Sequence, residues 1–226
     1  MPAESHKGAI RARRPGQYAR RRTRRIAWRA LLAIIAVLVS AALLGLALGL
    51  HSPVFVVVEV VAIAFFVSLD RWALPCIDRF DRGAKREEDV GGILEGLAER
   101  GWLSIHDVFI ERGNVDHIVV GPGGIFTIET KSHGGRIRLE EIDRRYLKQA
   151  YAEAKLIERV SGLKVKPLLV FSRAYLVGSV PCRREGVEIL PARMLAGYFE
   201  RRDGAIPAER IATVHRDLLA RVNALG

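Results

Sequence analysis

The sequence predicts an α/β domain, with a central mixed sheet of four or five strands flanked by helices, behind two transmembrane helices. Two observations support this prediction. Residues 26–70 contain two apolar runs long enough to cross a bilayer, whereas the rest of the 226-residue chain has the mixed composition of a soluble domain. After residue 83, short strand-like segments alternate with amphipathic helical segments.

The first 25 residues form a basic segment. They hold nine Lys and Arg against one Glu, a charge of +8, whereas residues 70–226 contribute only +3 of the total of +11. With few apolar residues and no helical periodicity, the segment is expected to be a disordered tail beside anionic lipid, with direct nucleic-acid contact as the alternative. The charge is therefore weak evidence for a nucleic-acid surface on the folded domain. Two isolated cysteines exclude a disulfide framework.

Residues 26–70 are expected to form a helical hairpin in the membrane. The apolar run Ile26–Leu50 is interrupted by His51, Ser52 and Pro53, and a second apolar run covers Val54–Leu69. Basic residues precede the first crossing and follow the second, but the connection has none, so both termini are expected in the cytoplasm, at the inner membrane. Glu59 lies within the second crossing and is expected to face the partner helix, with an ion relay in a membrane sensor as the alternative.

Residues 71–82 form a linker, and residues 83–226 form the folded domain. Apolar spacing and stop signals predict four helices: Gly83–Arg100, Arg144–Ser161, Ala192–Phe199 and Ala208–Leu225. Alternation and apolar runs predict six short strands: Leu103–Glu111, His117–Val120, Ile125–Lys131, Arg136–Leu139, Val165–Phe171 and Val187–Leu190.

The segment Asn114–Lys131 carries the residues that suggest chemistry. Strand alternation puts Glu129 and Lys131 on one face, about 7 Å apart along the strand. A Gly-Pro-Gly-Gly turn joins this strand to the preceding one, so Asp116 is expected near the level of Glu129. His117 should then point away from Asp116 and serve structure.

Two carboxylates and a lysine suit divalent-metal chemistry. Mg²⁺ takes oxygen ligands and typically keeps several waters beside one or two carboxylates. Such an ion activates water and neutralises charge on a phosphodiester, and a neighbouring Lys orients the water or stabilises the developing charge. A solvated strand face is the alternative for Glu129 and Lys131, and a turn residue is the alternative for Asp116.

The spacing Asp-x(12)-Glu-x-Lys, after a glutamate-bearing helix, resembles the PD-(D/E)XK nuclease superfamily. The segments GAKREEDV, GNVDHIVVGPGGIFTIETK and LKQA are similar to the nuclease-related (NERD) domain. This resemblance implies a restriction-endonuclease-like fold and an active-site set drawn from a helix, two strands and a second helix: Glu87, Asp116, Glu129, Lys131 and Gln149. It implies Asp116, Glu129 and Glu87 as ligands of Mg²⁺ or Mn²⁺. Arg86 stands where the family usually has glycine, which leaves Glu88 as an alternative to Glu87.

The sequence therefore suggests a membrane-anchored, cytoplasm-facing, metal-dependent nuclease-like protein acting on nucleic acid, either DNA or RNA, with DNA favoured. The alternative is a catalytically inactive module on the same fold that binds nucleic acid or a partner at the membrane. The small charge of residues 70–226 favours that alternative, because nucleic-acid-binding surfaces are usually more basic.

Overall fold

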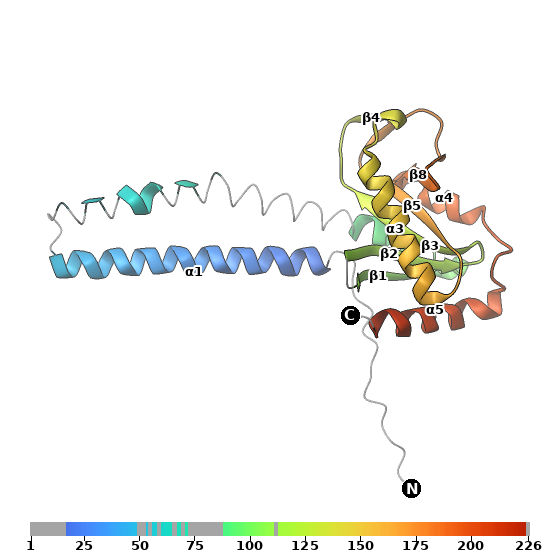
Figure 1. The fold of residues 1–226 in the computed structure, drawn as a ribbon, viewed down its shortest axis with the longest axis horizontal. Coiled ribbons are helices and arrows are strands. Elements are labelled where there is room, and N and C mark those ends of the chain that lie inside the picture. The colour runs from blue at the N-terminus through green and yellow to red at the C-terminus, as the bar shows by residue number, and fades with distance from the viewer. Residues whose placement is uncertain are drawn as a thin grey trace, which may run out of the picture. The chain divides into compact units, whose positions relative to one another are not determined.

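The computed structural model describes residues 17–48, 53, 56–57, 60–64, 67–68, 71, 88–110 and 113–224. The chain divides into two units, Tyr18–Gly83 and a second centred on Ala84–Gly226, which are described separately. Figure 1 shows both units as ribbons.

The first unit is dominated by the long helix α1 (Gln17–Leu48). Its segment Trp28–Ala47 has a mean hydropathy of 2.8, and only 6% of it is buried against protein. Large apolar side chains such as Leu38 and Leu43 are each 62% exposed. Among the described residues, α1 is the one helix long and apolar enough to cross a membrane, a test that a signal sequence also passes.

Part of the predicted second crossing, Val54–Leu69, lies outside the described residues, Glu59 among them. Of the predicted disordered tail, residues 1–16 lie outside the described residues, whereas residues 17–25 belong to helix α1. The described positions within the predicted crossing are helical, and the Ser68 hydroxyl donates to the Ala64 carbonyl one turn earlier. The structure thus gives one candidate span rather than the predicted pair.

The second unit is built on a six-stranded mixed sheet in the order β1-β2-β3-β5-β8-β7. Pairing is antiparallel along β1-β2-β3, parallel along β3-β5-β8 and antiparallel between β8 and β7. The strands of this sheet are β1 (Leu103–Ile110), β2 (Gly113–Gly121), β3 (Gly124–Lys131), β5 (Val165–Phe171), β7 (Cys182–Arg184) and β8 (Val187–Pro191).

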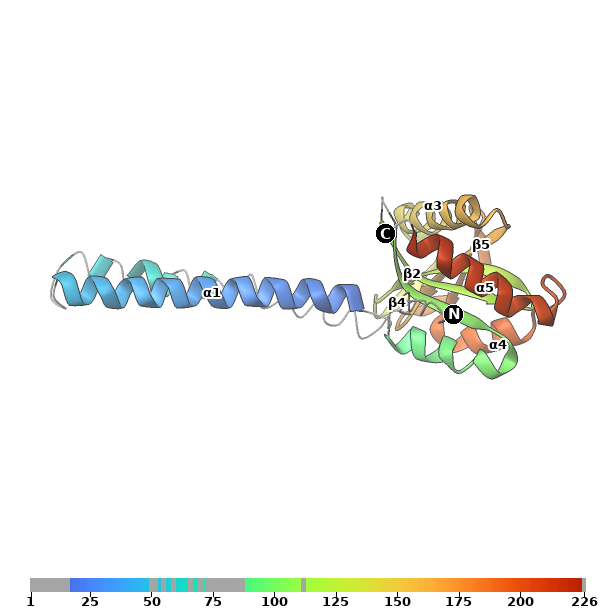
Figure 2. The ribbon, with the colours of Figure 1, turned by 90° about the horizontal axis from the view of Figure 1, so that it is seen from below.

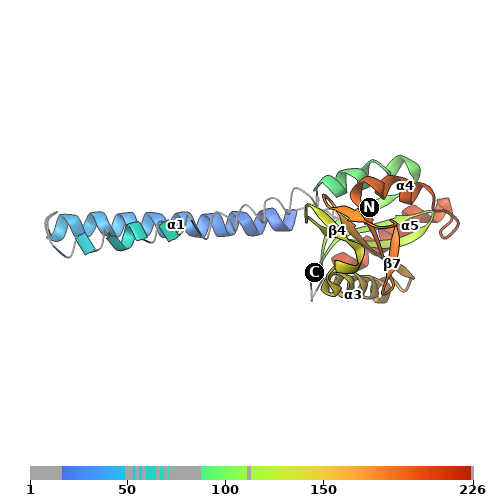
Figure 3. The ribbon, with the colours of Figure 1, turned by 90° about the horizontal axis from the view of Figure 1, so that it is seen from above.

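Helices cover both faces of this sheet, as Figures 2 and 3 show. One face packs on α3 (Arg144–Ser161) and α5 (Ala208–Asn223) through buried residues such as Ile125 and Ile157. The other face packs on the described helical residues 88–95 and on α4 (Leu195–Glu200), around Phe126 and Phe199. The predicted flanking of a mixed sheet by helices is therefore confirmed.

The central sheet has six strands rather than the predicted four or five, and two short segments, β6 and β7, were not predicted as strands because they had no readable pattern. β7 is a three-residue polar strand that completes the edge of the sheet. A separate two-stranded parallel sheet pairs β4 (Arg136–Arg138) with β6 (Tyr175–Val177). Three 3₁₀ turns complete the described elements: η1 (Ala98–Arg100), η2 (Leu139–Glu141) and η3 (Ala192–Met194).

The turn between β2 and β3 needs glycine because a large aromatic ring lies against its backbone. A Cβ added to Gly121 would lie 2.2 Å from Cε3 of Trp102. That ring is 2% exposed and packs 4.6 Å from the ring of Phe199 and 5.8 Å from that of Phe126, measured between centroids. The ring has no room to move, so the glycine allows β2 and the core to approach closely.

We predict that Gly121→Ala destabilises the domain by about 2–3 kcal/mol, because the added methyl group overpacks a filled core. Chemical denaturation of the full chain in detergent measures the change. Gly134→Ala is the matched control, since a Cβ at Gly134 meets nothing within 4 Å. Equal stability losses in the two variants would contradict the packing argument.

Candidate active site

Glu129 and Lys131 lie on the same side of β3, as strand alternation predicted. The Lys131 ammonium donates to Oε1 of Glu129 and forms an ion pair with it. Glu129 is only 3% exposed, and the lysine side chain is 16% exposed. The second carboxylate oxygen of Glu129, Oε2, is buried with no hydrogen-bond partner in the described part of the chain. A buried acceptor of this kind is costly and is often reserved for a ligand.

Helix α3 brings Gln149 to the lysine. The parallel strands β3 and β5 are joined through α3, which begins after Asp143, whose carboxylate accepts the Arg145 backbone amide. Buried Leu147 and Ala150 turn one stripe of α3 toward the sheet. Oε1 of the exposed Gln149 accepts from the Lys131 ammonium at 3.1 Å. The predicted contact between these two elements is therefore present.

Aromatic and histidine side chains complete the surroundings of Lys131. Its ammonium lies 4.7 Å from the ring centroid of Tyr146, a cation–π contact. The Tyr146 hydroxyl lies 3.2 Å from Nε2 of His133, in the loop after β3. Tyr146 is half-buried beside the lysine.

Glu153 is a site residue that sequence reasoning missed. The Gln149 amide donates to Oε1 of Glu153 at 3.0 Å, so one amide bridges the lysine and this second acid. Burial and then the negative charge of Glu129 raise the pKa of Glu153 to about 9. Glu153 is therefore neutral at pH 7. The signal was available, because residues four apart on a helix share a face and Glu153 follows Gln149 by four.

Asp116 lies on the same face of the sheet as Glu129. The paired residues of β2 and β3 end at His117 and Ile128, and one more step of this register sets Asp116 opposite Glu129. At that step Oδ2 of Asp116 accepts the Thr130 backbone amide at 2.8 Å. Asp116 is half-buried. Its hydrogen bond stabilises the end of the β2–β3 pairing, and its side chain lies on the sheet face that carries Glu129 and Lys131.

Asp107 is another acid that the sequence reasoning did not single out. It is 2% exposed and has a φ of 52°, an unusual conformation for a non-glycine residue within a strand. The pairs that flank it in β1 set it level with Asp116 of β2. The Asn114 amide donates to its carboxylate at 3.3 Å. β1 and β2 therefore bring a second carboxylate to the level of the cluster.

The expected helix carboxylate lies at the edge of the described residues. Glu87 lies outside the described residues, and Glu88 is the first described helical residue. This helix packs through Val90 and Leu94 on the face of the sheet that carries Phe126, opposite the face of Glu129 and Lys131.

His117 points away from Asp116, as predicted. Its ring is fully buried and shares a 2.8 Å hydrogen bond with His106, Nδ1 to Nδ1. Burial lowers the pKa of both rings, most strongly that of His117, where the neighbouring His106 adds to the effect. The pair is therefore a neutral structural contact between β1 and β2.

The fold and the site together define a class of protein with a mixed sheet covered by helices. In this class one strand carries an acid and a lysine, here Glu129 and Lys131. The neighbouring strand adds a second acid and a covering helix adds an amide side chain. Residues 82–172 match the family model described as the nuclease-related domain. The match covers β1 to β5 and α3, and so every site residue above. The resemblance read from the motifs is thereby confirmed for this segment.

No curated protein matches the chain. Among solved structures it is similar to a repair endonuclease from Pyrococcus abyssi (20% identity, TM-score 0.26), covering 50% of this chain and 42% of the endonuclease. It is also similar to Pyrococcus furiosus SfsA in complex with Ca²⁺ (19% identity, TM-score 0.27), covering 64% of this chain and 55% of that one. The chain thus spans less than half of the endonuclease and little more than half of SfsA.

Proposed function

We propose that this protein is a membrane-anchored, metal-dependent nuclease that hydrolyses nucleic-acid phosphodiesters, of DNA or RNA with DNA favoured, on the cytoplasmic side of the inner membrane. The observation that supports it most is the Lys131 ammonium held between Glu129 and Gln149, on the sheet face that also carries Asp116. This cluster lies within the segment that matches the nuclease-related domain.

The residues present fit a hard divalent cation such as Mg²⁺ or Mn²⁺. Two carboxylates suffice for an ion that keeps most of its waters, and the buried, unpartnered Oε2 of Glu129 is a ready oxygen donor. Asp116 and Glu129 would hold the ion, although the described residues contain no cluster of three or more His, Cys, Asp or Glu side chains for one. Such an ion, when bound, would supply an activated water and would neutralise phosphate charge.

Lys131 is the residue that would touch the reacting phosphate. Its charge stabilises the negative charge that develops on the phosphate oxygens, and its N–H groups orient the attacking water. Gln149 is a positioning residue, because its oxygen accepts from the ammonium while its amide is anchored on Glu153. The ring of Tyr146 contacts the Lys131 ammonium from another side and restricts the positions that the lysine side chain can take.

Membrane anchoring is the second part of the proposal. α1 supplies one span of sufficient length, and Val54–Leu69 would supply the second crossing. Basic residues on both flanks favour cytoplasmic termini and contact of the tail with anionic lipid. Substrate would then be met at the membrane surface.

The test incubates the full chain in detergent with labelled single- and double-stranded DNA and RNA, in Mg²⁺, Mn²⁺ or chelator. We expect cleavage only with metal and its loss in Asp116→Asn. Asn keeps an oxygen that accepts the Thr130 amide but removes the charge, so it separates chemistry from folding better than Asp116→Ala. Metal-dependent cleavage that survives in Asp116→Asn would eliminate Asp116 from the site.

A catalytically inactive binding module is the second candidate. The Asp116 carboxylate caps the end of the β2–β3 ladder, so this acid has a structural use without any reaction. Nucleic-acid binding by the full chain with no cleavage under any metal condition would favour this candidate.

A further inference from the structure

A basic cavity lies at the end of the sheet where the parallel strands begin, away from the acid–lysine cluster. It has a volume of about 440 Å³, within the range of small-molecule sites. Val165, at the start of β5, lines it and pairs with Ile125, four residues before Glu129 on β3. Four strand residues span about 13 Å, so this cavity is distinct from the cluster.

Positive charge dominates the cavity wall. Five cationic side chains line it: Lys155, Lys164, Lys166, Arg183 and Arg202. The two acids in the wall are already paired, Glu158 with Lys155 at 3.0 Å and Glu188 with Arg202 at 2.9 Å. The remaining three cations therefore leave the cavity with a formal charge of +3.

These three cations form no ion pair among the described residues. Within residues 88–110 and 113–224, Lys164 and Arg183 are exposed and form no ion pair, and Lys166 donates to the Gly123 carbonyl at 2.9 Å. Burial and then the positive charge of Arg202 lower the pKa of Lys166. Nε of Arg202 is buried with no partner among the same residues. Crowded, unsatisfied donors of this kind indicate a site for an anion.

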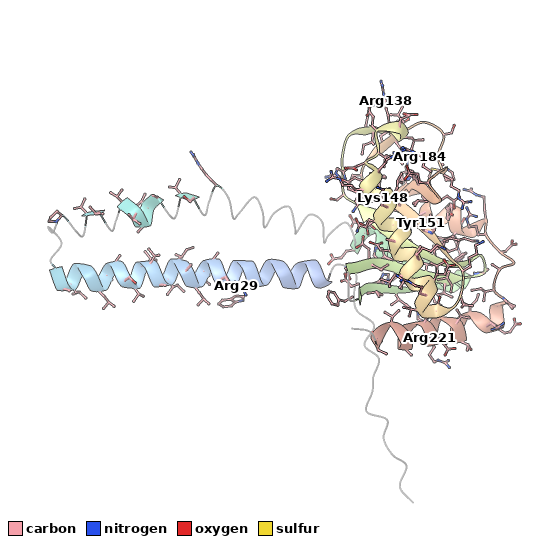
Figure 4. The ribbon with its side chains drawn as sticks, in the orientation of Figure 1. Arg29, Arg138, Lys148, Tyr151, Arg184 and Arg221 are labelled. Carbon is pink, nitrogen blue, oxygen red and sulfur yellow. The ribbon has the colours of Figure 1, made fainter. Side chains whose placement is uncertain are left out.

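The cavity also offers an aromatic surface and an extension. Tyr151 of α3, labelled in Figure 4, lines it and is 44% exposed. An adjoining cavity of about 270 Å³ shares Lys164 and Lys166 and adds Arg210 of α5. A flat ring beside clustered cations matches the base and phosphates of a nucleotide better than a bare inorganic anion.

We propose that this basic cavity binds the phosphates of a nucleotide, either free or within a nucleic-acid strand. The inference goes beyond the proposed function and does not depend on cleavage. It gives the domain a second phosphate site at the opposite end of β3 from the acid–lysine cluster.

The test measures binding of ADP, and of a 5′-phosphorylated ten-nucleotide single strand, to the full chain in detergent with chelator present. The double variant Lys164→Glu/Arg183→Glu reverses two unpaired cations of the cavity. Arg216→Glu on α5 is the control, because this exposed arginine lies outside both cavities. Asp116→Asn is measured in parallel, so that loss of cleavage and loss of binding are separated.

We expect binding to fall at least about tenfold in the double variant and to stay unchanged in Arg216→Glu. If ADP binding shows this pattern, a free nucleotide is the source of the phosphates. If only binding of the oligonucleotide shows it, the source is a nucleic-acid strand. No binding of either probe, or an equal loss in Arg216→Glu, would overturn the proposal. Thermal unfolding of each variant verifies that the fold is intact.

Discussion

Lys131→Met is expected to lower the rate of metal-dependent phosphodiester cleavage by about 10²- to 10⁴-fold, the usual range for one acid–base or charge-stabilising group. Methionine keeps the length and apolar stem of the side chain but removes the ammonium that contacts Glu129 and Gln149. The measurement is single-turnover cleavage at saturating Mg²⁺, which isolates the chemical step from substrate binding.

The matched control for this experiment is Lys148→Met. Lys148 is an exposed lysine on α3, three residues before Tyr151, and Figure 4 labels both residues. It carries the same charge but makes no contact with Glu129 among the described residues. A cleavage rate in Lys131→Met within twofold of the unmodified chain would remove Lys131 from the reaction, whatever the effect on affinity.

The geometry around Lys131 could be predicted wherever a local rule decides it. Strand alternation gives the shared face of Glu129 and Lys131, and the hairpin turn gives the level of Asp116. Gln149 came from the family motif, because nothing local says which turn of a helix meets a distant strand. The crossover from β3 through α3 to β5 supplies that information only in three dimensions.

The remaining features could not be predicted from the sequence, because the patterns that indicate them are too short or depend on residues far apart in the chain. β7 has three residues, two of them arginine, and three residues cannot display a period. The four-residue spacing places Glu153 beside Gln149 on α3, but its burial against Glu129 follows only from the packing of α3 on the sheet. The basic cavity gathers cations from α3, β5, β7 and the segment after α4, so the small overall charge of residues 70–226 conceals it.

Glu153→Gln is expected to make the domain more stable than the unmodified chain as pH rises. The carboxyl has an ordinary pKa of 4.5 in the unfolded chain and a pKa of about 9 in the fold. Between these values the folded state binds a proton that the unfolded state has lost, so stability falls with rising pH by at most about 1.4 kcal/mol per pH unit. The stability that this group contributes is fully present below pH 4.5 and is lost toward pH 9.

Glutamine mimics the neutral acid, since its carbonyl still accepts from the Gln149 amide. The two proteins should therefore have similar free energies of unfolding at pH 5, and the variant should be more stable by about 2 kcal/mol at pH 8. This figure is below the ideal limit because Glu153 is only partly buried. Denaturant unfolding in chelator at both pH values gives the difference, with Glu141→Gln at an exposed glutamate as the control. A difference that does not grow with pH, or that grows equally in the control, would contradict a protonated Glu153 and with it the neutral anchor assigned to Gln149.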